Sequence, residues 1–452
     1  MNRKALLFFA AGIVLNSLCH SPRAHADVTL LDQNEWRFLA GGFVELEMFA
    51  DSSRSFTEVV GDAPVARNGT LAGDNGRTEF SVRNSRLDFS ILPPAGESWK
   101  TKGYLEFDLL GYEANPGVNS QSESNYFVNA TFRLREAILQ ADSGGWFIMA
   151  GQYWTLFGWQ MAYLMPSVSD APVPGEMYER TPQVTLIKTI SLDEQNNLFP
   201  AVSLTRPVQR DSQIPGIDAG LRATFGGRKA ASSAATSDIK VQSMSAAITG
   251  SLREFESQTP GGSLSDKTHY LGSAIAADVF LPIITVSDVA DLQNSLTITG
   301  EFTSGQGYGD QFPNWTGGLP QPLSTTTTPP AAENLDAGQG DFDSTGSFQL
   351  IHLQTWNLSM QYFLPTETPT FISAGYGQLY SNNIDTLVNA TTGLTSGGNV
   401  PYDRAETFFA NVMHDFTPHV RVALEISHVR THYADDWQPH NNRLQVSTWF
   451  RF

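Results

Sequence analysis

Apolar and polar residues alternate along many short segments of the chain, as they do in β-strands whose two faces meet different surroundings. In the segment 217–226 the odd positions are apolar from Ile217 to Phe225, whereas Asp218 and Arg222 occupy even positions. The segments 36–50, 102–111 and 420–431 show the same opposition of apolar and charged residues. One face of each segment suits hydrocarbon and the other suits water.

The alternation extends over the whole chain and predicts about sixteen strands, with boundaries uncertain by a few residues. They are expected near residues 36–50, 78–91, 102–111, 130–141, 146–157, 182–191, 198–206, 217–226, 239–253, 268–281, 293–303, 347–363, 370–380, 404–415, 420–431 and 442–452.

The links between these strands alternate in length. Those after even-numbered strands are mostly short, as at 142–145 and 416–419, although 227–238 and 282–292 are long for turns. Those after odd-numbered strands are longer: 51–77, 112–129, 158–181, 304–346 and 381–403. Short periplasmic turns and long outer loops characterise bacterial outer-membrane barrels. We therefore expect an all-β, transmembrane antiparallel β-barrel. In a secreted β-sandwich, the alternative, short and long links are not expected to alternate in this way.

The final strand, 442–452, has Phe450 and Phe452 on its apolar face. A terminal strand that closes on Phe is similar to the assembly signal that the barrel assembly machinery of Gram-negative bacteria recognises. We expect these two residues to serve that role, and the protein to reside in the outer membrane among lipid and lipopolysaccharide.

The N-terminus has the pattern of an export signal. Arg3 and Lys4 precede an apolar run over 5–18, and small residues at 24–26 suit cleavage. The expected organisation is a signal peptide at 1–26 and a barrel at 27–452. Cys19 is the sole cysteine, and the bulky Leu18 before it argues against lipid attachment.

Composition excludes other classes. The net charge is −18, which disfavours binding to nucleic acid through phosphate contacts. No segment after the signal has the length of apolar sequence that a transmembrane helix needs. A mean hydropathy of −0.21 is compatible with a barrel, because half of each strand faces water.

Charged residues on the strands are expected to face the lumen, because an arginine on the lipid face at the bilayer midplane costs about 2–4 kcal/mol. The expected pore-lining residues are Arg86, Glu106, Asp108, Arg133, Arg135, Arg222, Arg421, Glu425 and Arg443. Guanidinium groups bind carboxylates, which favours a weak anion preference centred on Arg86, Arg133, Arg135 and Arg222. Alternatively, the arginines only pair with lumen carboxylates and stiffen the wall.

The link 158–181 contains prolines and few charges, which suits a loop that folds inward and narrows the pore. Asp170, Glu176, Glu179 and Arg180 are its expected charged residues.

An enzyme is the main alternative. No Gly-x-Ser-x-Gly motif occurs, and His428 and His432 would lie roughly 13 Å apart on a strand, too far to share a metal. We expect no cofactor, metal or catalytic residue. A barrel enzyme with an active site at the rim remains the second hypothesis, and an adhesin or structural barrel the third.

Several segments together resemble the DcaP-like trimeric porins of Gram-negative outer membranes. The resemblance is carried by residues 42–47, 84–87, 106–108, 133–137, 151–157 with its Gly-Gln-x-Trp-x-x-Phe motif, 180–184 and 411–452. It implies a sixteen-stranded homotrimer that passes small hydrophilic, often anionic solutes, with the loop after the fifth strand narrowing the pore. The short stretch between Ala26 and Trp36 leaves no room for the helical stalk that relatives can carry, so we expect none.

Overall fold

The structure is a computed structural model. It describes residues 28–94, 96, 98–111, 130–168, 173–209, 212–258, 266–287, 291–312, 315–320, 335–388, 392–395 and 398–452. The expected signal peptide at 1–26 therefore lies outside the described residues.

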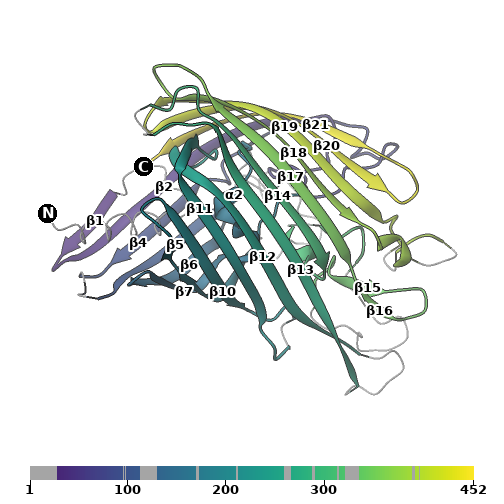
Figure 1. Ribbon diagram of the computed structural model, residues 1–452. Helices are drawn as coiled ribbons and strands as arrows, with labels where there is room; N and C mark the ends of the chain where they lie inside the picture. The colour runs from purple at the N-terminus through teal and green to yellow at the C-terminus, as the bar shows by residue number, and fades with distance from the viewer. Residues whose placement is uncertain are drawn as a thin grey trace.

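Most of the described chain is in β-strands that form one antiparallel sheet (Figure 1). Its strands are β1 (Val28–Gln33), β2 (Trp36–Asp51), β3 (Arg77–Ser81), β4 (Arg86–Leu92), β5 (Lys100–Gly111), β6 (Thr131–Ser143), β7 (Trp146–Trp154), β8 (Arg180–Lys188), β9 (Ile190–Ser191), β10 (Asn196–Thr205), β11 (Gly216–Ser232), β12 (Lys240–Gln258), β13 (Lys267–Ile284), β14 (Leu296–Gln306), β17 (His352–Phe363), β18 (Thr370–Ser381), β19 (Tyr402–Thr417), β20 (Val420–Tyr433) and β21 (His440–Arg451). A small hairpin, β15 (Gly340–Phe342) and β16 (Phe348–Leu350), stands apart. The helical turns are η2 (Phe157–Trp159), α2 (Gln160–Tyr163), η3 (Gly309–Gln311) and η4 (Ile384–Thr386). Among the described residues, no helix is long and apolar enough to cross a membrane.

The sheet closes into a barrel because β2, near the start of the chain, pairs on one side with the last strand, β21, as well as with the next strands on its other side. β2 pairs with β21 over Phe43–Asp51, and on its other side with β3 and β4. Gly42 and Phe452 complete the closure by exchanging two backbone hydrogen bonds of 3.1 and 3.0 Å. In the described chain β3 with β4, and β8 with β9, each form one wall strand, and β1 only extends the hairpin at the start of β2, so the wall has sixteen strands. The predicted sixteen-stranded barrel is confirmed.

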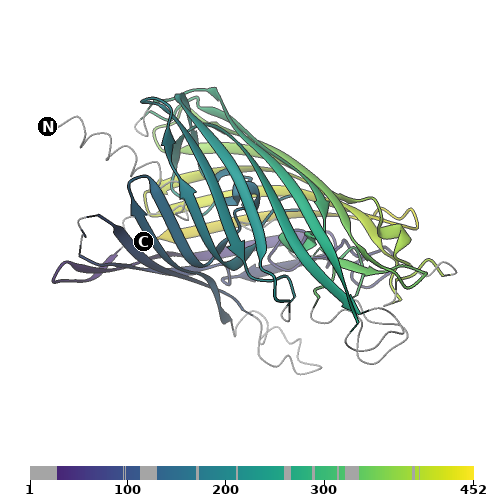
Figure 2. The same cartoon turned by 60° about the horizontal axis from the view of Figure 1, so that its bottom comes forward.

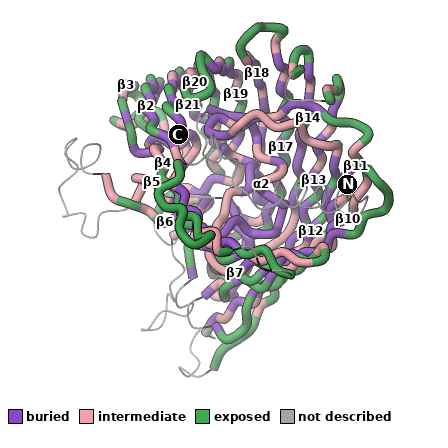
Figure 3. Tube along the Cα trace, turned by 90° about the vertical axis from the view of Figure 1, so that its left-hand side faces the viewer, coloured by how far each residue is buried: buried purple, intermediate pink, exposed green. Residues whose placement is uncertain are grey.

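The two faces of the wall differ as the alternation predicts. On β21, Leu444, Thr448 and Phe450 are exposed on the outside, whereas Arg443, Gln445 and Ser447 are buried on the lumen side. Figure 3, seen from the end that carries the chain termini, shows buried and exposed residues alternating along the strands. Apolar side chains thus cover the outside, and polar side chains fill much of the inside.

Short turns lie at one end of the barrel and long links at the other, as Figures 1 and 2 both show. The turns 144–145 and 418–419 lie at the end with the termini, and the hairpin β15–β16 lies at the opposite, outer end. The predicted alternation of short turns and long links is confirmed.

Three boundary predictions are wrong for identifiable reasons. The expected strand 146–157 ends at Trp154, because the chain there leaves the wall and enters the lumen. The expected strand 347–363 begins at His352, since residues 348–350 pair with β15 instead. The long link 227–238 shrinks to 233–239 because β11 continues to Ser232, whereas the link 282–292 keeps its length and moves to 285–295, because β13 continues to Ile284 and β14 begins at Leu296. β1 is an additional strand that the sequence analysis missed.

Candidate pore and constriction

The link between β7 and β8, residues 155–179, folds into the lumen, and we call it the constriction loop. It carries η2 and α2. The backbone N–H of Gly158 donates to Thr249 Oγ1 on β12 (2.8 Å), and Asn411 Nδ2 on β19 donates to the carbonyl of Pro166 (2.8 Å). Neither β12 nor β19 is a neighbour of β7 or β8 in the wall. The constriction loop therefore crosses the interior of the barrel.

Two glycines allow the constriction loop to touch β18 closely. Gly175 has φ +93°, and a Cβ placed on it would lie 2.4 Å from the backbone nitrogen of Gln378. A Cβ on Gly377 would lie 2.3 Å from the carbonyl oxygen of Pro174. Both distances are shorter than real Cβ contacts, so a side chain at either position would push the loop from the wall.

Glu176 braces the loop internally. Its carboxylate is buried and accepts hydrogen bonds from the backbone N–H groups of Met165 (2.7 Å) and Val173 (3.5 Å). It therefore joins the two arms of the constriction loop. Asp170, another of the loop's three expected acids, lies outside the described residues.

Arg222, expected to line the pore, instead holds the constriction loop. Its Nε donates to the hydroxyl of Tyr163 (3.2 Å), which in turn donates to Ser245 Oγ (3.1 Å). The guanidinium is buried, with its centre 5.5 Å from that of the Tyr163 ring. The α2 segment is thereby fixed to β11 and β12.

Four arginines gather on the wall formed by β4 to β8, around two carboxylates, and we call Arg86, Arg133, Arg135, Arg180, Glu106 and Asp108 the arginine cluster. Arg133 and Arg135 pair with Asp108 at 2.5 and 2.9 Å, and Arg135 also pairs with Glu106. Arg180 stacks over the ring of Trp154 at 4.7 Å and repels Arg133 and Arg135 electrostatically.

A β-bulge shapes this cluster. The register shifts between Glu106 and Phe107, so that Arg135 and Glu136 of β6 are both buried on the lumen side. The carboxylate of Glu136 accepts a hydrogen bond of 2.7 Å from Nε1 of Trp154. Such bulges re-aim side chains at the cost of one unpaired backbone position.

On this wall the carboxylates are buried, whereas three of the four arginines of the cluster are partly exposed and Arg135 is buried at 2% exposure. Glu106, Asp108, Asp88 and Glu136 are all buried, at 7% exposure or less. Arg86, Arg133 and Arg180 are partly exposed, and the side chain of Arg133 reaches 36%. Guanidinium groups of Arg86, Arg133 and Arg180 are therefore partly accessible from the lumen, with the carboxylates packed beneath them.

The other expected lumen residues support inward-folded segments. Glu425 is buried and accepts hydrogen bonds from Val168 N–H and Asn411 Nδ2. Arg443 pairs with Asp51 at 2.7 Å and donates to the carbonyls of Thr57 and Glu58 in the link after β2. Arg421 pairs with Asp415 and holds the turn between β11 and β12.

Glu179 and Arg180 end the constriction loop beside the arginine cluster. Burial, with a smaller contribution from Asp310, raises the pKa of Glu179 to about 8, against the opposing effect of Arg180 and two further arginines. Glu179 is therefore largely protonated at neutral pH. Arg180 opens β8 and belongs to the cluster described above.

The sequence matches no known family model, and no curated protein sequence matches it. Its structure is similar to that of the outer membrane channel DcaP of Acinetobacter baumannii, with 14% sequence identity, a TM-score of 0.62, and coverage of 94% of this chain and 100% of that one. This chain has the DcaP fold. The predicted resemblance, and with it the outer-membrane barrel architecture, is confirmed at the level of fold.

Two further solved structures match with TM-scores of 0.48. One is an anion-selective porin from Comamonas acidovorans, at 9% identity, covering 92% of this chain and 100% of that chain. The other is the trimer form of OmpT of Vibrio cholerae, at 10% identity, covering 92% and 99%.

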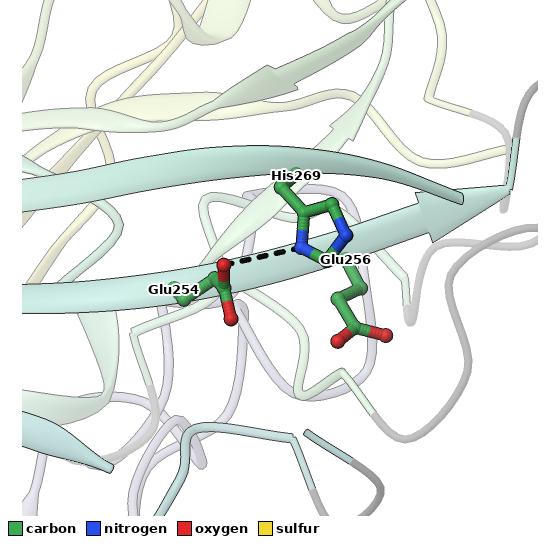
Figure 4. Close-up of side chains that lie close together, drawn as sticks. All are labelled: Glu254, Glu256 and His269. Carbon is green, nitrogen blue, oxygen red and sulfur yellow. Dashed lines mark hydrogen bonds and ion pairs between the residues drawn. The ribbon is translucent and has the colours of Figure 1, made fainter. Parts of the chain in front are cut away.

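On the outside of this DcaP-type barrel, Glu254, Glu256 and His269 lie close together near the outer ends of β12 and β13 (Figure 4). Their ligand atoms lie within 4.8 Å of one another. His269 Nδ1 is 3.1 Å from Glu254, and the ammonium of Lys267 pairs with Glu256 at 2.6 Å. These contacts satisfy the carboxylates without an ion.

Sequence reasoning missed the amides that hold the constriction loop of this fold. Asn357 Nδ2 donates to the carbonyl of Gly175 (3.1 Å), and Gln311 accepts from Thr155 Oγ1 (2.9 Å). No signal in the sequence pointed to Gln311, which lies in the turn η3, and for Asn357 the only signal was its lumen parity on β17, which many polar residues share.

Proposed function

We propose that this protein is an outer-membrane porin for the passive diffusion of small hydrophilic solutes, with a weak preference for anions such as carboxylates. The constriction loop narrows a polar lumen, and the arginine cluster lies where the loop rejoins the wall at Arg180. The observation that carries the anion preference is the exposure of Arg86, Arg133 and Arg180 above buried carboxylates.

The net charge of −18 would favour the passage of cations, but the effect of each charge on ion selectivity depends on where it lies in the barrel. Charges at a wide mouth are screened over a Debye length of about 8 Å at physiological ionic strength. Charges on a narrowed wall act at closer range, where fields are focused. The local arginines therefore outweigh the total charge.

We further propose a homotrimer, by resemblance to the DcaP-like family, surrounded by outer-membrane lipid and lipopolysaccharide and inserted by the barrel assembly machinery. Light scattering of the detergent-solubilised protein tests the trimer. A monomeric mass under conditions that preserve conductance would contradict it.

Planar-bilayer recording under a salt gradient tests the porin function. We expect open channels whose reversal potential indicates a weak anion preference, and a shift toward cations when Arg86, Arg133 and Arg180 are replaced together by Ala. Arg67→Ala is the control, because Arg67 pairs with Asp435 in the outer links and its side chain is 26% exposed.

Folded protein without conductance would contradict the porin, and would favour a rim-site enzyme or a structural barrel. A cation preference that the triple variant leaves unchanged would contradict the anion preference alone. Liposome swelling with a small carboxylate and a neutral sugar of similar size tests the solute class.

A further inference from the structure

A second segment folds into the lumen, at the end of the barrel that carries the termini. It is the turn between β11 and β12, residues 233–239, which we call the inward turn. Ser233, Ala235 and Ser237 are 3%, 0% and 2% exposed. The turn between β9 and β10, residues 192–195, is fully exposed by contrast. The inward turn therefore differs from an ordinary periplasmic turn.

Arg421 of β20 holds the backbone of the inward turn. Its Nη1 donates to the carbonyls of Ala234 (2.8 Å), Ala235 (3.0 Å) and Ser237 (2.9 Å) and to Ser233 Oγ (3.0 Å). Its Nε and Nη2 pair with Asp415 at 2.5 and 2.9 Å, and the side chain is fully buried.

These contacts span the barrel. In the described wall, β13, β14, β17, β18 and β19 separate β12 from β20. A turn that starts from β11 and β12 can meet the lumen face of β20 only by crossing the interior. Arg421 is the second residue of β20, so the crossing lies at the periplasmic end.

Further contacts fix the inward turn in place. The side chain of Gln361 on β17 accepts from Ser233 N–H and donates to the Ser233 carbonyl, both at 2.9 Å. Ala231 and Ala235 belong to an apolar cluster with lumen-facing side chains that include Phe363, Phe371, Met413 and Trp449. The backbone of the inward turn is hydrogen-bonded to Arg421 on β20 and to Gln361 on β17, and its alanines pack against apolar side chains. These contacts fix the inward turn in one position.

A chamber lined by both polar and apolar side chains lies between the constriction loop and the inward turn. Met161, Ala162, Leu164 and Pro166 of the constriction loop line one side. Residues 232–234, Ser237 and Asp238 line the other, and the rest of the lining is formed by Lys240, Gln242, Phe280, Thr297, Thr299, Ser359 and Gln361. The two inward-folded segments thus bound the same space from opposite ends.

We propose that the inward turn is a second constriction, in series with the constriction loop, and that Arg421 is the residue that positions it. This inference rests on the proposed porin function. A solute that passes the constriction loop enters the chamber and must still pass the inward turn to reach the periplasm. Since resistances in series add, both segments then limit the flux, and the second one selects by size at the exit.

Single-channel conductance tests the proposal. In one variant an Asn-Gly turn joining Ser232 to Lys240 replaces residues 233–239, in the second Arg421 is replaced by Ala, and in the third Gln361 is replaced by Ala. We expect the first to raise the conductance by about 1.5-fold or more, because the narrowest exit is widened, and the other two to raise it less. Replacing the exposed turn 192–195 by Asn-Gly is the matched control and should leave the conductance unchanged.

Thiol labelling gives a second, independent measure. Cys19, within the expected signal peptide, is the only cysteine, so Ala162→Cys would place a single thiol on the chamber side of the constriction loop. We expect a small thiol reagent applied from the periplasmic side to react in either background, and a bulky one to react quickly only when the inward turn has been replaced.

The outcomes separate the two proposals. No conductance in the wild-type protein would contradict the porin function. Wild-type conductance that the turn replacement leaves unchanged, with equal labelling by the bulky reagent in both backgrounds, would overturn the second constriction. Heat-modifiable mobility on mild gels identifies variants that fail to fold. If Arg421→Ala fails to fold, the conductance of the turn-replacement variant and of Gln361→Ala tests the second constriction.

Discussion

The backbone N–H of Val168 donates a hydrogen bond of 2.7 Å to the carboxylate of Glu425, although 257 residues separate them. Asn411 Nδ2 donates to the same carboxylate oxygen at 2.9 Å. This buried carboxylate on β20 therefore ties the tip of the constriction loop to the far wall. An intramolecular hydrogen bond contributes about 0.5–1.5 kcal/mol, which favours the attached position of the loop.

Glu425→Ala should release that tip. We expect a higher mean single-channel conductance and more current noise, because the constriction loop loses its attachment to β20. Glu425→Gln is the control, since its amide oxygen can still accept from Val168 N–H. Equal conductance and noise in Glu425→Ala and the wild type would contradict this role.

Arg133 should influence ion selectivity, whereas Arg222 should influence conductance. Arg133→Ala removes a partly exposed charge while Asp108 keeps Arg135 as a partner, so the reversal potential should move toward cation preference. Arg222→Ala should change the conductance through loss of the Tyr163 contact, with little effect on the reversal potential. The prediction fails if Arg222→Ala shifts selectivity as strongly as Arg133→Ala.

Ion selectivity should depend on pH through Glu179. Its pKa is raised to about 8, so the side chain is mostly neutral below that pH and negatively charged above it. The new charge lies next to Arg180, so anion preference should fall as the pH rises from 7 to 9. Reversal potentials of the wild type and Glu179→Gln measure this. A pH profile that is identical in both would assign the titration to another group.

Barrel closure should depend on Phe452. Its backbone exchanges two hydrogen bonds with Gly42, and the ring centre lies 6.5 Å from that of Phe450. Phe452→Asp should lower the yield of folded barrel, because it introduces a charge at the seam where unsatisfied edges are costly in lipid. Heat-modifiable mobility measures folded yield, and Phe452→Tyr should remain close to wild type. An undiminished yield for Phe452→Asp would show that the aromatic end is dispensable.

Local alternation was sufficient to predict the wall but not its interior. Parity predicted a lumen position for Arg222 and Arg421, but it could not predict that Arg222 would hold Tyr163 and that Arg421 would hold the inward turn. Their partners lie 59 and about 187 residues away in sequence, and no periodic pattern links such positions. The same limit explains why the link 227–238, which contains the inward turn, appeared in the sequence only as a long turn.

Local sequence was enough to predict the number of wall strands, the faces of most of their side chains and the end at which long links gather, because side-chain direction in a regular strand repeats every two residues regardless of what lies across the barrel. Which lumen charges stay accessible depends on long-range contacts that local sequence does not encode. Arg133 is left partly exposed while Arg421 is fully enclosed, because each depends on whether a distant segment folds inward against it. Long-range contacts, and not local periodicity, therefore set the shape of the pore.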